Sequence, residues 1–392
     1  MKRAVVLLAI SLAFITPVVA EELSFENAFL LRNISGTAAN PGPEPHHARI
    51  VRSNAWTTFL DAQAFVAFSS ETGPEEQRTE VFSTNWFSAG AQRTIGSRGL
   101  LLVRGRVSLE PISMQDDAGY PQMLQLVSPV EPTDAPLVDR MRPQSLLGEA
   151  AAHFAFRTST ATFLHLYGAF VGDPALGTPS SALRSSSREF AVAPFAYDVQ
   201  ESFHEATRVA TLGWSSRWFT IEGSAFHDAR RFGDYSGVED GDIDSHSARL
   251  TVTPTRNWSL QISQGTLGED LREREISTAS ISYANANVAA SVLWTEQEDL
   301  QALGLEIVAR AKRNTVSARM ENVDRPAGVF GYTQVESTTH FQIGYIFDVF
   351  AGGTWRGGIG ANIDYHSQTH DLPEVYGHKP QAIYAFVRFR TE

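Results

Sequence analysis

The sequence has 392 residues, a formal net charge of −12 and no cysteine. The acidic balance argues against nucleic acid as a partner, because binding a phosphate backbone requires a basic face. No stretch after residue 20 holds 18 uncharged apolar residues, so the sequence predicts no transmembrane helix, and only strands could cross a membrane.

Residues 1–20 have the pattern of a cleaved secretory signal. Lys2 and Arg3 precede an apolar stretch, and small residues ending at Ala20 precede the acidic Glu21. Residues 21–53 show no alternation, and Asn40-Pro-Gly-Pro-Glu-Pro-His-His47 has the composition of turns and linkers. We expect residues 21–53 to form either a periplasmic tail or a partial plug of the lumen, and the sequence leaves both open.

From residue 54 onward the dominant pattern is alternation of apolar and polar residues. Trp258, Leu260 and Ile262, for example, alternate with serine and glutamine, as in a strand with one apolar face. About sixteen such segments (14–18) are predicted. They lie near residues 54–66, 83–93, 98–109, 145–157, 160–172, 206–215, 218–227, 244–253, 257–265, 275–284, 287–296, 300–311, 314–323, 335–349, 354–366 and 380–390.

The connections between these segments alternate in length. Short turns such as Lys312-Arg313 alternate with long loops near 67–82, 110–144, 173–205, 228–243, 266–274, 324–334 and 367–379. Short periplasmic turns and long extracellular loops are typical of an all-β transmembrane antiparallel barrel, which we predict for residues 54–392. Closure is required because unpaired strand edges are costly in lipid. The expected location is the outer membrane of a Gram-negative bacterium, with outer-membrane lipid and the barrel assembly machinery as partners.

Residue types also differ between the short turns and the long loops. Phe156, Trp214, Trp258 and Trp355 lie close to short turns, where an interfacial aromatic girdle is expected, although ordinary core aromatics would give the same pattern. Acidic residues are concentrated in the long loops, whereas arginine and lysine recur at the short turns. Charges of this kind can also be ordinary solvated loop residues.

Several stretches resemble a poorly characterised family of proteobacterial outer-membrane barrel proteins, described only as porin-like or hypothetical. These stretches are Ser83-Thr-Asn-Trp86, Arg104-Gly-Arg-Val-Ser-Leu-Glu-Pro111, Gly119-Tyr-Pro-Gln-Met-Leu-Gln125, Pro136-Leu-Val-Asp-Arg140, Gly172-Asp-Pro-Ala-Leu-Gly177, Glu222-Gly-Ser-Ala-Phe226, Asp244-Ser-His-Ser-Ala-Arg-Leu250 and Tyr376-Gly-His-Lys-Pro380. The resemblance implies a barrel and its location, and no activity. The chain departs from the relatives' histidine-containing runs at Arg142-Pro-Gln-Ser145 and Ala193-Pro-Phe-Ala-Tyr-Asp198.

Charged residues recur on the strand faces that should point inward. A sixteen-stranded barrel is too wide for its own side chains to fill, so these residues are predicted to line a pore. The predicted pore-lining residues are Arg104, Arg106, Glu149, His153, Arg157, Arg249, Glu306, Arg310, Arg319 and Glu321. Arg104 and Arg106, two positions apart, form a candidate basic strip. A salt-bridge lattice that only solvates the lumen is the alternative.

The loops near 110–144 and 173–205 are long enough to fold inward and narrow a channel, although surface loops packed on their neighbours are the alternative. The predicted function is therefore a porin-like diffusion channel for small polar solutes or ions. A surface receptor or adhesin acting through the long loops, or an outer-membrane enzyme, are the other hypotheses.

The sequence contains no pattern that points to catalysis or to a bound metal. The histidines are scattered, His366 and His370 fall at a strand end and in a loop, and no Gly-x-Ser-x-Gly motif occurs. We therefore predict no catalytic residues, no metal ligands and no cofactor, and classify the protein as a non-enzyme.

Overall fold

The structure is a computed structural model that describes residues 33–41, 48–53, 55–72, 78–114, 119–127, 137–228, 236, 238, 241–268, 273–326, 335–368 and 380–392. The predicted signal at residues 1–20 lies outside these ranges. Within them, no helix is both long enough and apolar enough to span a membrane.

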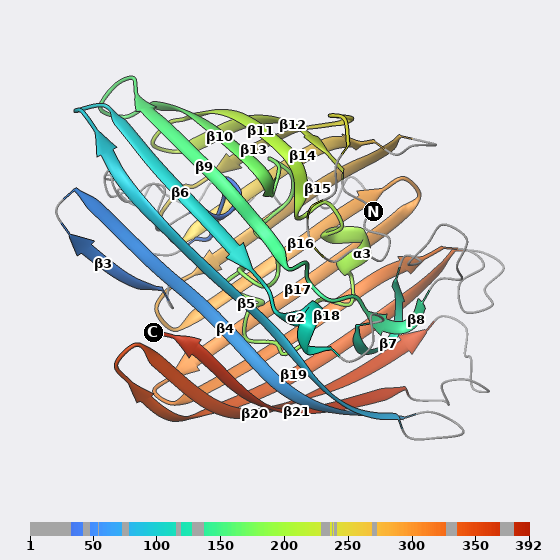
Figure 1. The fold of residues 1–392 in the computed structure, drawn as a ribbon. Helices are drawn as coiled ribbons and strands as arrows, with labels where there is room; N and C mark the ends of the chain where they lie inside the picture. Colours follow the sequence, from blue (N-terminus) through green and yellow to red (C-terminus); the bar gives the residue numbers. More distant parts are fainter. Residues whose placement is uncertain are drawn as a thin grey trace.

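Sixteen strands of the described chain form one closed antiparallel barrel (Figure 1). They are β4 (Trp56–Glu71), β5 (Arg78–Ile95), β6 (Gly99–Val107), β9 (Leu147–Arg157), β10 (Phe163–Gly172), β11 (Ala206–Ser215), β12 (Phe219–His227), β13 (Ser245–Val252), β14 (Trp258–Leu267), β15 (Arg274–Ala284), β16 (Val288–Gln297), β17 (Leu300–Ala311), β18 (Asn314–Arg325), β19 (Glu336–Gly352), β20 (Trp355–Gln368) and β21 (Gln381–Thr391). Each pairs with its neighbours in this order, and β21 closes the ring on β4.

The other elements lie at the rim or inside the ring. β3 (Arg49–Ser53) forms a hairpin with the first residues of β4 at the end that carries the short turns. β1 (Asn33–Ser35) pairs with β2 (Ala38–Ala39), and β7 (Tyr120–Val127) pairs with β8 (Leu137–Met141). α2 (Glu110–Ser113) follows β6, and α3 (Tyr197–Gln200) lies between β10 and β11.

The predicted fold class is confirmed, and every predicted segment corresponds to one strand of the barrel. The largest differences are at β4 and β5, which extend into the predicted long loop 67–82 and pair as far as Glu71 and Arg78. Antiparallel pairing continues there through the backbone, although apolar and polar residue types no longer alternate strictly. Sequence periodicity therefore underestimated the length of this hairpin.

The two faces of the barrel have opposite polarity. The outer face exposes large apolar side chains, such as Ile262 at 56 %, Ile343 at 65 % and Ile363 at 56 %. The inner face buries arginine, glutamate, serine and threonine. A soluble protein has the reverse arrangement, so this polarity fits a barrel whose outer surface faces lipid. Phe156, Trp214 and Trp355 are also exposed near short turns, which excludes a place in the core for these three.

Closure of the ring leads to a prediction about electrophoresis. The folded protein should migrate faster in an unheated SDS gel than after boiling, because a closed sheet without free edges resists SDS. The comparison of heated and unheated samples checks this expectation. Identical migration of both samples would contradict a closed membrane barrel.

Candidate functional site

The inward segment, residues 173–205, connects the fifth and sixth strands of the ring and occupies the lumen. Figure 1 shows α3, which belongs to this segment, inside the barrel. Most of its side chains are buried, and the backbone N–H groups of Ala175 and Gly177 donate to the hydroxyls of Ser224 on β12 and Ser263 on β14. The segment was predicted to fold inward, and the structure places it there.

Arg184 fixes the middle of the inward segment to the wall. Its guanidinium makes two bonds of 2.9 Å to the carboxylate of Glu306 on β17, and a third of 2.8 Å to Glu201. The hydroxyl of Ser186 also donates to Glu306 at 2.9 Å. Arg184 is fully buried, and although burial alone would lower its pKa, Glu306 and Glu201 raise it further above its usual value. Paired planar geometry of this kind is the strongest form of charged hydrogen bond.

Three further ion pairs attach the neighbouring residues of the inward segment to the wall. Arg188 donates to Asp61 of β4 at 2.9 and 3.2 Å, and its guanidinium lies 4.8 Å from the ring centre of Trp86. Glu189 accepts from Arg310 of β17 at 3.1 Å and from Arg388 of β21. The inward segment is thus attached to strands on several sides of the ring.

The end of the inward segment meets the β7–β8 region. Glu321 of β18 accepts the backbone N–H groups of Phe195 and Ala196 at 3.0 and 2.9 Å. Ala193 donates its N–H to the hydroxyl of Tyr120 at 2.8 Å, and Gln125 donates to Asp198 at 2.8 Å. The region 110–144 therefore packs against the inward segment through the β7–β8 hairpin.

Residues 33–41 also lie on the lumen side. Arg104 donates to the carbonyl of Gly36 at 2.8 Å, Arg249 donates to the hydroxyl of Thr37 at 2.6 Å, and the hydroxyl of Ser35 donates to Asp173. For residues 21–53 the sequence left a tail and a plug open, and these contacts put part of the range inside the barrel. Residues 21–32 and 42–47 lie outside the described part.

All ten predicted pore-lining residues occupy inward-facing strand positions. Arg104, Arg106, Glu149, His153, Arg249, Glu306, Arg319 and Glu321 are at most 5 % exposed. Arg310 is half-buried, and Arg157 is half-buried at the short-turn end of β9. Most of them contact the inward segment or residues 33–41. The structure therefore gathers them around these two segments inside the barrel and does not leave them along an open aqueous path.

The candidate basic strip needs a correction. Arg104 makes two bonds of 2.7 Å to Glu149, which also accepts from the hydroxyl of Tyr167 at 2.9 Å. Arg106 lies 3.8 Å from Asp173 of the inward segment. The two positive charges are therefore buried among carboxylates, because the neighbouring strand and the inward segment supply their counter-charges.

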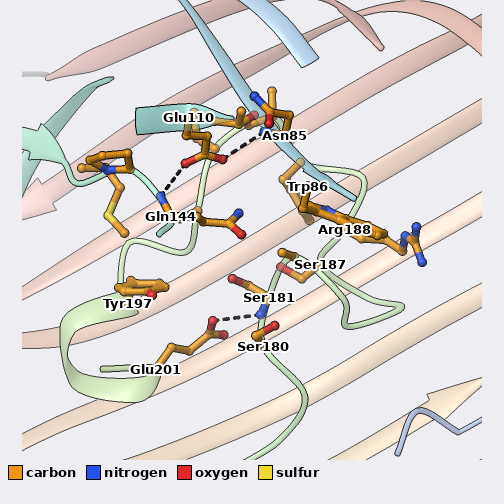
Figure 2. Close-up of a pocket in the computed structure, with 18 of the residues that line it drawn as sticks. Asn85, Trp86, Glu110, Gln144, Ser180, Ser181, Ser187, Arg188, Tyr197 and Glu201 are labelled. Carbon is orange, nitrogen blue, oxygen red and sulfur yellow. Dashed lines mark hydrogen bonds between the residues drawn. The ribbon is translucent and has the colours of Figure 1, made fainter. Parts of the chain in front are cut away.

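A cavity of about 70 Å³ remains between the inward segment and the wall formed by β4 and β5. Gln63, Thr84 and Trp86 line it from the wall, and Ser181 and Ala191 line it from the inward segment. Figure 2 shows Trp86 and Arg188 packed on one another here, with Ser181 donating its N–H to Glu201 at 2.9 Å. A cavity needs about 10–15 Å³ of this kind of space to hold one water, and the lining includes polar side chains such as Gln63 and Thr84, so the cavity suits a few waters or a small solute.

Glu110 closes one side of this cavity. Its carboxyl accepts the backbone N–H groups of Asn85 at 3.0 Å and Gln144 at 2.6 Å (Figure 2). Burial raises the pKa of Glu110 to about 8, and the two backbone hydrogen bonds only partly oppose this rise. At pH 7 the group is therefore mostly neutral and anchors the chain on either side of the β7–β8 hairpin.

Within the described residues, no group of three histidine, aspartate or glutamate side chains has the geometry of a metal site. His153 packs edge-on against His165, with ring centroids 5.1 Å apart. His366 stacks on His340 with ring centroids 4.7 Å apart, and His370 lies outside the described ranges.

The sequence did not reveal the residues that attach the inward segment to the barrel wall. Some of them belong to the segment itself and others to the strands. Asp61, Arg184, Arg188, Glu189 and Arg388 belong to this set. The three charged residues in the stretch Arg184-Ser-Ser-Ser-Arg-Glu189 were the available sign.

The fold and lumen define a class, the sixteen-stranded antiparallel barrel with an inward-folded segment after its fifth strand. No known protein family and no curated protein matches the chain. Among solved structures, it is similar to a mutant of Rh. blastica porin, with 13 % identity over 85 % of this chain and 99 % of that one, at a TM-score of 0.47. It is also similar to OmpT, an outer membrane protein of Vibrio cholerae, with 9 % identity over 88 % and 100 % and a TM-score of 0.46. These likenesses concern the fold alone.

Proposed function

We propose that this protein is an outer-membrane diffusion channel for small polar solutes or ions, with the cavity beside β4 and β5 as the narrowest part of its path. One observation carries the proposal. The barrel is wider than its own side chains could fill, and the inward segment crosses it while leaving a cavity against one wall that polar and apolar side chains line together. The lipid-compatible outer face and the aromatic residues near the short turns support the location.

The proposal gives the charged wall residues a clear role. Arg319 and Glu306 hold the inward segment in place through Ser187 and Arg184, and in this way they shape the conduit. We propose no catalytic step. The proposed partners of this chain are small solutes or ions, outer-membrane lipid and the barrel assembly machinery. If the folded protein shows no conductance, a receptor that acts through its long loops becomes the favoured function.

Conductance of the refolded protein in a planar bilayer tests the channel. We expect discrete steps that are small for a sixteen-stranded barrel, because the inward segment blocks most of the lumen. Ala191→Trp should reduce the steps further, since Ala191 lines the cavity and a large ring there would occupy it. Ala361→Trp is the matched control, because Ala361 is exposed on the outer face of β20.

A protein that shows the heat shift of a folded barrel but no conductance would contradict the channel. Equal steps for Ala191→Trp and the wild type would instead reject this cavity as the path.

A further inference from the structure

The end of the barrel with the short turns carries exposed positive charge. In Figure 1 this is the end at which β3 and the C-terminus lie. Its exposed cations include Arg49 and Arg52 on β3, Arg93 on β5, Arg98 in the β5–β6 turn, and Lys312 and Arg313 in the β17–β18 turn. Arg217 and Arg256 are exposed at the β11–β12 and β13–β14 turns. We call this set the basic rim.

Negative charge is distributed in the opposite way. Among the described residues at the rim, Glu392 is the exposed carboxylate, and it pairs with Arg356. At the other end of the barrel, Asp242, Glu275 and Glu298 are exposed. Because the chain as a whole has a net charge of −12, the positive rim reflects where the charges are placed and not the overall composition.

Exposed tryptophans lie at the same level as the rim. Trp56, Trp218 and Trp355 are 39, 48 and 43 % exposed, and the guanidinium of Arg93 lies 5.6 Å from the ring centre of Trp56. Rings of this type prefer the headgroup level of a membrane. Cations beside such a belt are therefore positioned at the lipid phosphates.

We propose that the basic rim binds the phosphate groups of anionic lipids in the leaflet at the short-turn end. The proposal rests on the membrane location proposed above. Guanidinium groups match phosphate oxygens in charge and in planar geometry. The turns that carry the cations lie in separate parts of the ring, an arrangement that fits a surrounding layer of lipid better than one compact partner. A clustered basic segment near a membrane attracts anionic headgroups in the same way.

Lipid selection can be measured with brominated lipids, which quench tryptophan fluorescence on contact. The full chain is folded into phosphatidylcholine bilayers that contain a fixed fraction of brominated phosphatidylglycerol or, in parallel, of brominated phosphatidylcholine. We expect the anionic lipid to quench more strongly at equal fraction. The excess should shrink at 1 M salt, where the Debye length falls to about 3 Å.

The test variant combines Arg52→Gln, Arg93→Gln, Arg98→Gln, Lys312→Gln and Arg313→Gln. All five side chains are exposed, so the barrel should still fold, and the heat shift on gels verifies it. We expect the excess quenching to disappear. The control combines Arg78→Gln with Arg208→Gln, two exposed cations at the other end, and it should keep the excess.

Two results would overturn the inference. One is equal quenching by the two lipids in the wild type, and the other is an excess that survives in the fivefold variant. If equal quenching is accompanied by binding to purified peptidoglycan that the fivefold variant loses, the rim is assigned to the cell wall. Absence of quenching by either lipid would overturn the membrane location itself, whereas the first two results leave the proposed channel intact.

Discussion

Replacing residues 174–204 by a short glycine–serine linker should increase the single-channel conductance several-fold. Gly172 and Ala206 are directly paired partners on β10 and β11, so a short linker can close the hairpin without moving either strand. Without the inward segment the lumen of a sixteen-stranded barrel is too wide to be filled, and its wall charges become hydrated. Planar bilayer recordings and solute uptake by vesicles both measure the change.

The same experiment separates two roles of the inward segment. A folded deletion variant with larger steps and faster uptake of larger solutes identifies the segment as the constriction. Unchanged steps in a protein that still shows the heat shift would mean that the conducting path does not pass the segment.

Glu189→Gln should release the inward segment from the wall. Glu189 is the shared partner of Arg310 and Arg388, and its loss leaves two arginines without this counter-charge inside the barrel. Breaking a buried pair in this way costs about 3–5 kcal/mol. If this cost reduces the free energy that holds the inward segment against the wall, the population of undocked segment rises about a hundredfold or more.

The absence of cysteine from the chain makes the release measurable. Ala191→Cys places one thiol at a position that is 1 % exposed, so a maleimide larger than the adjoining cavity of about 70 Å³ should react with it only when the segment leaves the wall. The labelling rate should rise strongly when Glu189→Gln is added. Glu80→Gln is the matched control, because the Glu80–Arg140 pair is partly exposed and such pairs contribute only about 0–1 kcal/mol. Equal labelling rates for the two variants would contradict the role of Glu189.

Moderately acidic pH should not release the inward segment in the way that Glu189→Gln does. Burial alone would raise the pKa of Glu189, but Arg388, Arg310 and Arg188 together lower it from 4.5 to about 2. The stabilisation by a carboxylate with a lowered pKa is present above the ordinary value and is lost as the pH falls through the lowered one. Glu189 should therefore hold the segment at pH 4. The labelling rate of Ala191→Cys, divided by the rate of a fully exposed cysteine at the same pH, should be equal at pH 4 and pH 7, because the reactive thiolate becomes rarer at both positions as the pH falls.

The barrel was predictable because its signals are local. Alternation within each strand and the parity of loop lengths can be read in short windows, and strands such as β11 and β17 begin and end where the pattern does. The inner-face position of Arg104 or Glu306 follows from the same alternation.

The counter-charges that surround these residues were not predictable from the sequence. They depend on pairs such as Arg184 with Glu306 and Arg188 with Asp61, which are 122 and 127 residues apart. No local pattern records such distances, so Arg104 and Arg106 were interpreted as an open basic strip while Glu149 and Asp173 in fact surround them.

The attachment of the inward segment has a consequence for the order of assembly. The segment leaves the ring after β10, but Glu306 and Arg388 belong to β17 and β21, and Glu189 lies 199 residues before Arg388. Contacts between such distant residues form late, because the long intervening chain must be ordered first. The charges of the inward segment that pair with β17 and β21 must therefore stay unmatched until these strands arrive. Completing the ring also supplies the residues that hold the segment inside it.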